Sequence, residues 1–190
     1  TGNYYQRLRC TGILIMYFTN FPIIAYDSVG NGNFKLATNL LKRVAVRSKV
    51  KTNTALFDTY DVREGETPEI IAHKLYGDSE LHWVVLLMND ITDRYHQWPM
   101  TTPQFLAFLN EKYSDPDGLH HYEITQTSGD TTLKIDVGTS NADYPTATAV
   151  TNFEFEEKEQ DKKRKIKLLD PGYVPQVVEE FQEMINESDI

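Results

Sequence analysis

Cysteine is nearly absent from this sequence: Cys10 stands alone, so no disulfide can form within the chain. The absence fits a reducing compartment, or a fold that needs no covalent cross-link. The five histidines are scattered, and no Cys/His spacing is typical of a zinc site. The sequence therefore predicts no metal site and no cofactor.

Long hydrophobic runs are also missing, although a membrane-spanning helix needs about 18 consecutive apolar residues. The short apolar stretch 11–18 follows Arg7 and Arg9, as in a signal peptide, but no small-residue cleavage site comes after it. Met16 opens a plausible chain start, which would make residues 1–15 upstream or expression-derived sequence. The alternative is that they form a genuine arm. In either case we expect no membrane span.

Basic residues are in the minority, because 19 lysines and arginines face 28 acidic residues and the net charge is −9. Phosphate contact needs clustered positive charge, so this balance argues against nucleic-acid binding. It suits solubility and a basic protein partner. Apolar residues make up 40% of the 190, which is enough for a packed core in one modest domain with extensions or in two small domains.

No catalytic constellation has supporting context, since no Ser-His-Asp, Cys-His or metal-ligand pattern is present. Glu66 and Glu69 could form a carboxylate pair for glycoside cleavage, but first-turn acids of a helix are the simpler interpretation. His120 and His121 are interpreted as a strand-edge pair rather than a metal site. We therefore predict a protein without enzymatic activity.

The N-terminal part combines aromatic residues with strong turn signals. Residues 16–34 lack a helical period and include the Gly/Asn run 30–33, so we interpret them as an extended arm. Its aromatics need either the body of the chain or a neighbour to pack on. Residues 35–50 carry a stripe of leucine and valine that predicts a short helix. The basic residues there form either a solvated face, which is the simpler interpretation, or a contact for an acidic partner; they are Lys42, Arg43, Arg47 and Lys49.

The middle of the chain has clear element boundaries. Alternation predicts a strand over 57–62, and Thr67 followed by Pro68 is typical of a helix start. Gly77 suits a left-handed cap that ends this helix, and Asp78 suits the N-cap of a second helix over 79–89. That second helix is apolar almost all round, so we expect it to be buried on more than one side. A third helix is predicted over 103–113.

The C-terminal third begins after the turn at 115–118, a candidate module boundary. Alternation predicts a β-hairpin over 120–137 with its turn at 128–130, followed by a loop over 138–149. Phe153 and Phe155 are predicted to begin a further strand. The acidic and basic runs that follow would face each other in a hairpin or form a solvated loop. Residues 174–185 predict an amphipathic helix that docks on its own domain or on a partner.

A dense motif occupies residues 60–90, and its elements are Tyr60, Val62, Gly65, Glu66, Thr67, Ile71, Ala72, Tyr76, Gly77 and Asn89. This pattern resembles the LysM module, which opens with Tyr-x-Val-x-x-Gly-(Asp/Glu)-Thr, continues through Ile-Ala and Tyr-Gly, and closes its second helix with Asn. The resemblance implies a βααβ fold, with two helices on one face of a two-stranded antiparallel sheet.

LysM modules usually bind N-acetylglucosamine polymers in a groove between the first strand–helix loop and the second helix–strand loop. The first loop is present here at 63–68, but the second departs from the family pattern. A glycine is missing, and bulky residues fill the segment from Ile91 to Trp98. We therefore predict no useful affinity for chitin or peptidoglycan. Trp83 and Trp98 are interpreted as packing residues rather than sugar platforms.

A wider set of motifs covers nearly the whole chain, at 40–44, 65–72, 76–78, 82–86, 98–99 and 165–171. Together they resemble the LysM-containing baseplate wedge proteins of contractile-tailed phages. The resemblance implies a virion subunit that is assembled in the host cytoplasm and joins neighbouring wedges near the hub. Its partners would be other wedge proteins and hub or tube-proximal proteins. The alternative is a LysM-type glycan-binding module that anchors a particle or an enzyme to cell wall.

These expectations give an α+β chain in five segments. They are a possible upstream segment (1–15), an extended arm and helix (16–55), a LysM-like module with a third helix (56–114), a β-hairpin region (115–169) and a C-terminal amphipathic helix (170–190). Protein contacts are predicted at large apolar side chains, namely Phe18, Phe21, Tyr26, Trp83, Trp98, Phe181 and Ile185.

Overall fold

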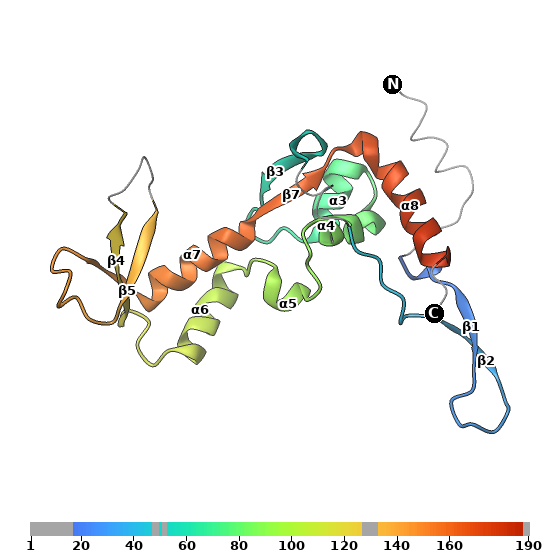
Figure 1. Cartoon of the computed structure of the whole chain (residues 1–190), viewed down its shortest axis with the longest axis horizontal. Coiled ribbons are helices and arrows are strands. Elements are labelled where there is room, and N and C mark those ends of the chain that lie inside the picture. Colours follow the sequence, from blue (N-terminus) through green and yellow to red (C-terminus); the bar gives the residue numbers. More distant parts are fainter. Residues whose placement is uncertain (1–16, 47–49, 51–52, 127–132, 188–190) are drawn as a thin grey trace. The chain divides into compact units, whose positions relative to one another are not determined.

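The structure, a computed structural model, describes residues 17–46, 50, 53–126 and 133–187 (Figure 1). The segment 1–15 and the predicted turn at 128–130 lie outside the described residues. Helices and strands are mixed, which confirms the α+β class. The chain forms two compact units: the first takes its described residues from 17–59, 67–92 and 167–187, and the second from 60–66 and 93–166. Neither unit is continuous in sequence.

The first unit opens with a short 3-10 helix, η1 (Tyr17–Asn20), and a hairpin of β1 (Ile23–Tyr26) and β2 (Lys35–Thr38). The strands are antiparallel, with Ile23 opposite Thr38 and Tyr26 opposite Lys35. The helix predicted over 35–50 is therefore wrong where the structure describes it. Its leucine stripe matches a helical period, but pairing with β1 takes Lys35–Thr38 into a strand, and residues 39–46 form no helix.

Capping residues fix the helices of the first unit. The 3-10 turn η2 (Thr54–Leu56) leads into strand β3 (Phe57–Asp61), and α3 (Pro68–Tyr76) follows. The Thr67 hydroxyl accepts a hydrogen bond from the Ile70 N–H, and Gly77 ends α3 in the left-handed region at φ 77°. The Asp78 carboxylate then accepts from the Glu80 N–H and starts η3 (Ser79–Leu81), which continues as α4 (His82–Met88). Each of these caps confirms a sequence prediction.

An aromatic cluster forms the core of the first unit around the C-terminal helix α8 (Val174–Glu187), which follows the 3-10 turn η4 (Pro171–Tyr173). The Phe181 ring lies 4.6 Å from the Trp83 ring and 5.8 Å from the Tyr17 ring, measured between centroids. Phe21 packs edge-on against Tyr17. The predicted amphipathic helix is confirmed, and Val174, Phe181 and Ile185 of its apolar stripe are buried within this unit.

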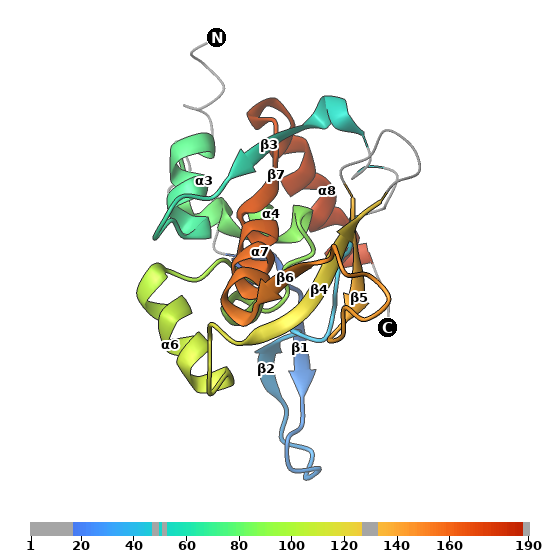
Figure 2. The same cartoon turned by 90° about the vertical axis from the view of Figure 1, so that its left-hand side faces the viewer.

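The second unit combines α5 (Arg94–Gln97), α6 (Thr102–Lys112) and a three-stranded antiparallel sheet with α7 (Asn152–Arg164) packed beside it (Figure 2). The sheet has the order β5–β4–β6, with bounds Lys134–Gly138, Leu119–Thr125 and Thr148–Thr151. Ile124 pairs with Ile135, which confirms the predicted hairpin strands. The third predicted helix is confirmed as α6.

The strand and charged hairpin predicted after residue 153 are wrong, because this segment is the helix α7. Thr151 and Glu154 form a reciprocal capping box: the Thr151 hydroxyl accepts from the Glu154 N–H, and the Glu154 carboxylate accepts from the Thr151 N–H. The charged side chains pair along the helix at i, i+3 spacing, as Lys162 does with Glu159. The strand β7 (Lys165–Leu169) begins only where α7 ends.

The described residues were searched for membrane-spanning helices and for metal-binding groups of side chains. Among them, no helix has the length and apolar character required to cross a membrane. Nor do the residues that the structure describes contain a group of three or more His, Cys, Asp or Glu side chains placed to hold a metal ion.

Candidate assembly surfaces

The β3–β7 sheet joins segments that lie far apart in sequence. Its ladder is continued by two backbone hydrogen bonds of 2.9 Å, from the Asp170 N–H to the Leu56 carbonyl and from the Val62 N–H to the Arg164 carbonyl. Residue numbers run in opposite directions in these two bonds, so the strands are antiparallel. The helices α3 and α4, which contact each other, follow β3 in the chain, whereas β7 returns only after α7.

Asn89 ties the end of α4 to β7. Its amide oxygen accepts from the Lys167 N–H, and its amide nitrogen donates to the Lys167 carbonyl, both at 2.8 Å. The same nitrogen donates to the Val85 carbonyl at 2.8 Å. A side-chain amide can make the two backbone hydrogen bonds that a neighbouring strand would otherwise make, because it offers a donor and an acceptor side by side. The sequence singled out Asn89, but not the strand that it binds.

The loop between β3 and α3 is closed by bonds made inside the chain. The buried Glu66 carboxylate accepts from the Tyr60 hydroxyl at 2.8 Å and from the Arg63 N–H at 3.0 Å. The Trp98 indole N–H donates to the Glu66 carbonyl at 2.8 Å. Gly65 adopts φ 74°, as the turn requires. Glu66 precedes the N-cap, so the first-turn interpretation holds for Glu69 and not for Glu66.

A carboxylate, an ammonium and a phenol meet between α6 and α7, and sequence reasoning missed this group. The buried Glu156 carboxylate accepts hydrogen bonds from the Lys112 ammonium and, at 2.7 Å, from the Tyr113 hydroxyl. Burial raises the pKa of Glu156, but these bonds outweigh it and hold the pKa below the ordinary glutamate value. No local signal links residues so far apart in sequence.

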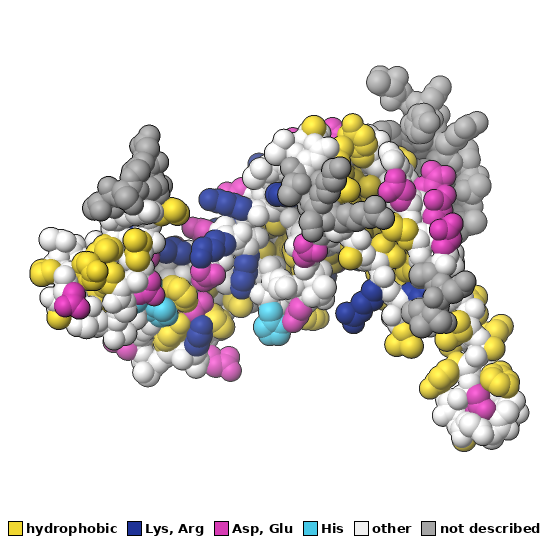
Figure 3. Space-filling view, viewed as in Figure 1, with side chains coloured by type: hydrophobic (Ala, Val, Ile, Leu, Met, Phe, Trp, Pro, Cys, Tyr) yellow, Lys and Arg dark blue, Asp and Glu magenta, His cyan; other side chains and the backbone are white. Residues whose placement is uncertain are grey.

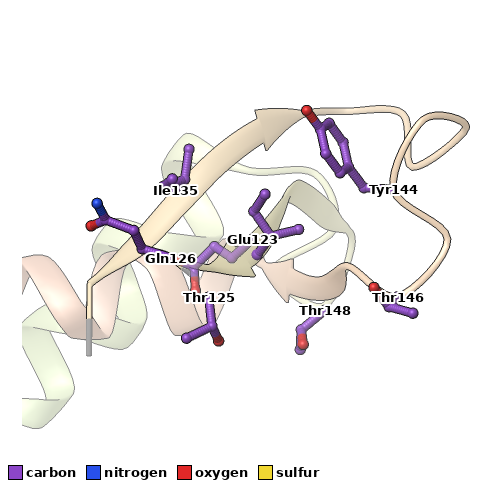
Figure 4. A pocket seen from close by; sticks show the side chains of 8 residues that line it. Glu123, Thr125, Gln126, Ile135, Tyr144, Thr146 and Thr148 are labelled. Carbon is purple, nitrogen blue, oxygen red and sulfur yellow. The ribbon is translucent and has the colours of Figure 1, made fainter. Parts of the chain in front are cut away.

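A shallow pocket of about 530 Å³ lies on the second unit's sheet (Figure 4). Its lining residues come from β4 and the residue after it, from β5, and from β6 and the segment before it; they are Glu123, Ile124, Thr125, Gln126, Ile135, Tyr144, Thr146 and Thr148. Glu123 is its acidic group, and Lys158 and Lys134 both pair with this carboxylate. Burial raises the pKa of Glu123, but the lysine contacts hold it below its ordinary value. A carboxylate so neutralised is a poor base, which agrees with a packing role.

His120 and His121 lie on β4 beside α7. Their Nδ1 atoms are 2.8 Å apart, and the His120 ring stacks on the Phe155 ring at 3.9 Å. His121 also contacts Glu123 through Nε2 at 3.3 Å. The pair therefore contributes to the packing between the sheet and the helix.

The family of the chain is decided by a match over most of its length. The family model described as "Base plate wedge protein 53" matches residues 16–126, which is more than half of the 190. The chain belongs to the base plate wedge protein 53 family. It is accordingly a structural protein of the phage tail baseplate within the virion.

A curated relative agrees with this assignment. The baseplate wedge protein gp53 of Enterobacteria phage T4 is 26% identical to the chain over 126 residues. That match covers 58% of this chain and 64% of the relative, so the chain spans just under two thirds of the relative's length. The family match includes the β1–β2 hairpin, β3, α3 and α4, together with β4.

Membership of the wedge family makes the exposure of the predicted contact residues important. Five of the seven are buried within the chain, namely Phe21, Trp83, Trp98, Phe181 and Ile185. Their aromatic and aliphatic surface completes the chain's own packing. Phe18 and Tyr26, each 57% exposed, remain candidates.

Proposed function

We propose that this chain is a structural wedge subunit that joins neighbouring wedge proteins near the baseplate hub, without enzymatic activity. The observation that carries the proposal is the arrangement of two paired strands, β3 and β7, with the helices α3 and α4 between them in the chain. The chain also belongs to the wedge family. In this proposal the unit is a LysM-like βααβ module used for protein contacts. Its partners are other wedge proteins and hub or tube-proximal proteins, reached through protein surface rather than through nucleic acid.

The residues of the LysM-like motif support this assignment because they cap α3, are buried, or bind β7. Thr67 and Gly77 begin and end α3, and Ile71, Ala72 and Tyr76 are buried. Asn89 binds the backbone of β7, the strand that we assign as the second strand of the βααβ module. The chain therefore inserts residues 90–164 where a LysM module has only a short loop. The bulky residues after Asn89 belong to this insertion.

The alternative function, glycan binding, is disfavoured by the first loop. The Glu66 carbonyl already accepts the Trp98 indole N–H, and the Glu66 carboxylate is bound by Tyr60 and Arg63. A sugar would have to displace these internal partners, which costs the hydrogen bonds that they make. The insertion also replaces the second loop that a LysM groove needs. We propose that the module has exchanged sugar contacts for protein contacts.

Titration of the chain with chitin pentamer separates the two functions. We expect no saturable heat at ligand concentrations up to about 1 mM, because the loop's polar groups are occupied within the chain. A sugar-binding LysM module titrated under the same conditions serves as the positive control. Saturable binding with a Kd of about 1 μM or tighter would contradict the proposal and favour the glycan-binding function.

A further inference from the structure

A β-bulge on β4 brings two neighbouring histidines of the second unit onto one aromatic ring. Between Leu119 and His121, β4 advances by two residues while its partner β6 advances by one, so His120 is the extra residue. Successive side chains of a regular strand point to opposite faces of the sheet, and a bulge removes this alternation. Both imidazole rings contact the Phe155 ring of α7, with centroid distances of 3.9 Å for His120 and 5.9 Å for His121.

The contacts of the pair fix the position of each ring hydrogen in the neutral state. His121 is buried, and its Nε2 atom lies 3.3 Å from the Glu123 carboxylate, which accepts hydrogen bonds and cannot donate them when ionised. Nε2 of His121 therefore carries the hydrogen, and its Nδ1 atom is an acceptor. The Nδ1 atom of His120 lies 2.8 Å away and must donate to it. One hydrogen thus lies between the two Nδ1 atoms.

One additional proton fits this geometry. If it binds Nε2 of His120, the hydrogen between the two Nδ1 atoms stays in place. If His121 carries the charge instead, this ring donates from both of its nitrogens, to Glu123 and to His120, and the hydrogen of His120 moves to Nε2. In either case a single hydrogen lies between the two Nδ1 atoms. The packing of both rings on Phe155 is therefore kept.

A second proton does not fit. When both rings are charged, each Nδ1 atom carries a hydrogen, and two donors face each other at 2.8 Å without an acceptor between them. The two positive charges then lie on rings whose centroids are 5.0 Å apart. Because His121 is buried, water and salt screen this repulsion less than they would at the surface. Two charged rings must therefore move apart.

The charged groups around the pair do not offset a second positive charge. Glu123 is the acid that contacts the pair, and its carboxylate is already bound by Lys158 of α7 at 3.0 Å and by Lys134 of β5 at 3.4 Å. Lysine and arginine side chains are visible over α7 in the space-filling view (Figure 3). The strand β6, which lies opposite His121, has no titratable side chain. Further acids of α7 and β5 have partners of their own; they are Glu154, Glu156, Glu159, Asp161 and Asp136.

We propose that His120 and His121 form an acid-sensitive joint between β4 and α7. The joint holds one proton with the sheet packed on the helix, and a second proton separates them. In an unfolded chain the two histidines are independent, and each ordinarily gains its proton near about pH 6.5. The folded unit then binds one proton fewer than the unfolded chain, so its stability is present in full above this pH and falls as the pH falls. The inference concerns the second unit alone and does not depend on the joining of wedges.

Nitrogen-15 NMR of the full chain tests the proton count of the joint. The ring nitrogen signals distinguish an imidazolium from each neutral tautomer, and the amide signals of β4 and α7 report whether the unit is folded. At about pH 8 we expect the hydrogens on Nε2 of His121 and on Nδ1 of His120. As the pH is lowered to about 5, we expect at most one of the two rings to become charged while the native amide signals persist. Two charged rings together with native amide signals would overturn the proposal.

The same substitution at a paired and at an exposed histidine tests the effect on stability. In His120→Asn the side-chain amide can donate to Nδ1 of His121 or accept from it, so His121 can gain its proton without a conflict. His96→Asn is the matched control, because the His96 side chain is 82% exposed and belongs to the second unit. Denaturant unfolding is followed by the amide signals of β4 and α7. Between about pH 7.5 and about pH 5, we expect the unfolding equilibrium constant to rise about 10- to 30-fold more in wild type and in His96→Asn than in His120→Asn.

Only the pH dependence of His120→Asn bears on the joint, because the lost stacking on Phe155 lowers stability to a similar extent at every pH. A rise that agreed with wild type within about three-fold would show that the pair is a packing contact without acid sensitivity, and the proposal would be wrong. If His120→Asn did not fold, the proton count of the wild-type rings would still decide the matter.

Discussion

Replacing Phe181 and Ile185 together by aspartate is expected to unfold the first unit rather than merely to weaken assembly. Phe181 is 2% exposed against Trp83, and Ile185 is fully buried. Truncating a buried phenylalanine costs about 3–5 kcal/mol, and burying an unpaired charge adds to this. Because whole domains are stable by only about 5–15 kcal/mol, the double variant should lose cooperative thermal unfolding. Circular dichroism during heating measures this loss.

The matched control is Met184→Asp on the same helix, at a side chain that is 46% exposed. We expect this variant to keep the wild-type circular dichroism and to lose less than about 1 kcal/mol. If the double variant stayed folded as well, the stripe of α8 would not be a core element. Its apolar residues would then have to be reconsidered as a partner contact.

Replacing Lys112 by methionine should destabilise the second unit by about 2–3 kcal/mol, because it leaves Glu156 buried without its cation. The value lies below the range for fully buried pairs because Lys112 itself is about half exposed. Denaturant unfolding measures the change. Lys162→Met is the control, since its exposed pair with Glu159 should contribute less than about 0.5 kcal/mol.

The pH dependence of this variant separates the charge from the packing of Lys112. The pKa of Glu156 is lowered in the folded chain, so the stability that ionised Glu156 contributes is present in full above the ordinary glutamate pKa of about 4.3. It is lost as the pH falls through the lowered folded pKa. The difference between wild type and Lys112→Met should therefore shrink as Glu156 becomes protonated. A difference that stays constant down to pH 3 would assign the effect to packing.

The parts of the fold that sequence could predict are those with local causes. Thr67, Gly77 and Asp78 act on N–H and carbonyl groups within four residues, so their caps are visible in the sequence. The pairing of β3 with β7 depends on contacts across about a hundred residues, and no local pattern encodes it. The strand Lys35–Thr38 pairs with the nearby β1 across a loop, whereas the leucine spacing of this segment matches a helical period.

In the charged segment after residue 151, the capping signal decides between a helix and a strand. Thr151 and Glu154 are a recognisable capping box, and this signal could have identified α7. The alternation of Phe153 and Phe155 predicts a strand, but a period of two over so few residues is also compatible with a helix. Phe153 packs on Phe105 at 5.6 Å, and Phe155 stacks on His120.

The contact residues were only partly predictable because apolar character does not tell an internal core from an interface. Phe181 and Ile185 have the spacing of a stripe that contacts a partner, but both are buried within the chain, where Phe181 packs on Trp83. Tyr26 was assigned to an extended arm, and it stays exposed within an ordered hairpin. Only the burial of each side chain in the structure distinguishes a core residue from a candidate contact residue.

The joining of wedges is the central claim, and depletion of the chain tests it most directly. A phage that carries this chain is grown with the gene interrupted, and tail intermediates are separated by sedimentation and viewed by negative-stain electron microscopy. The account predicts that single wedges accumulate and closed baseplates are lost, with recovery when the chain is supplied again. Closed baseplates that form at the normal level without the chain would contradict it.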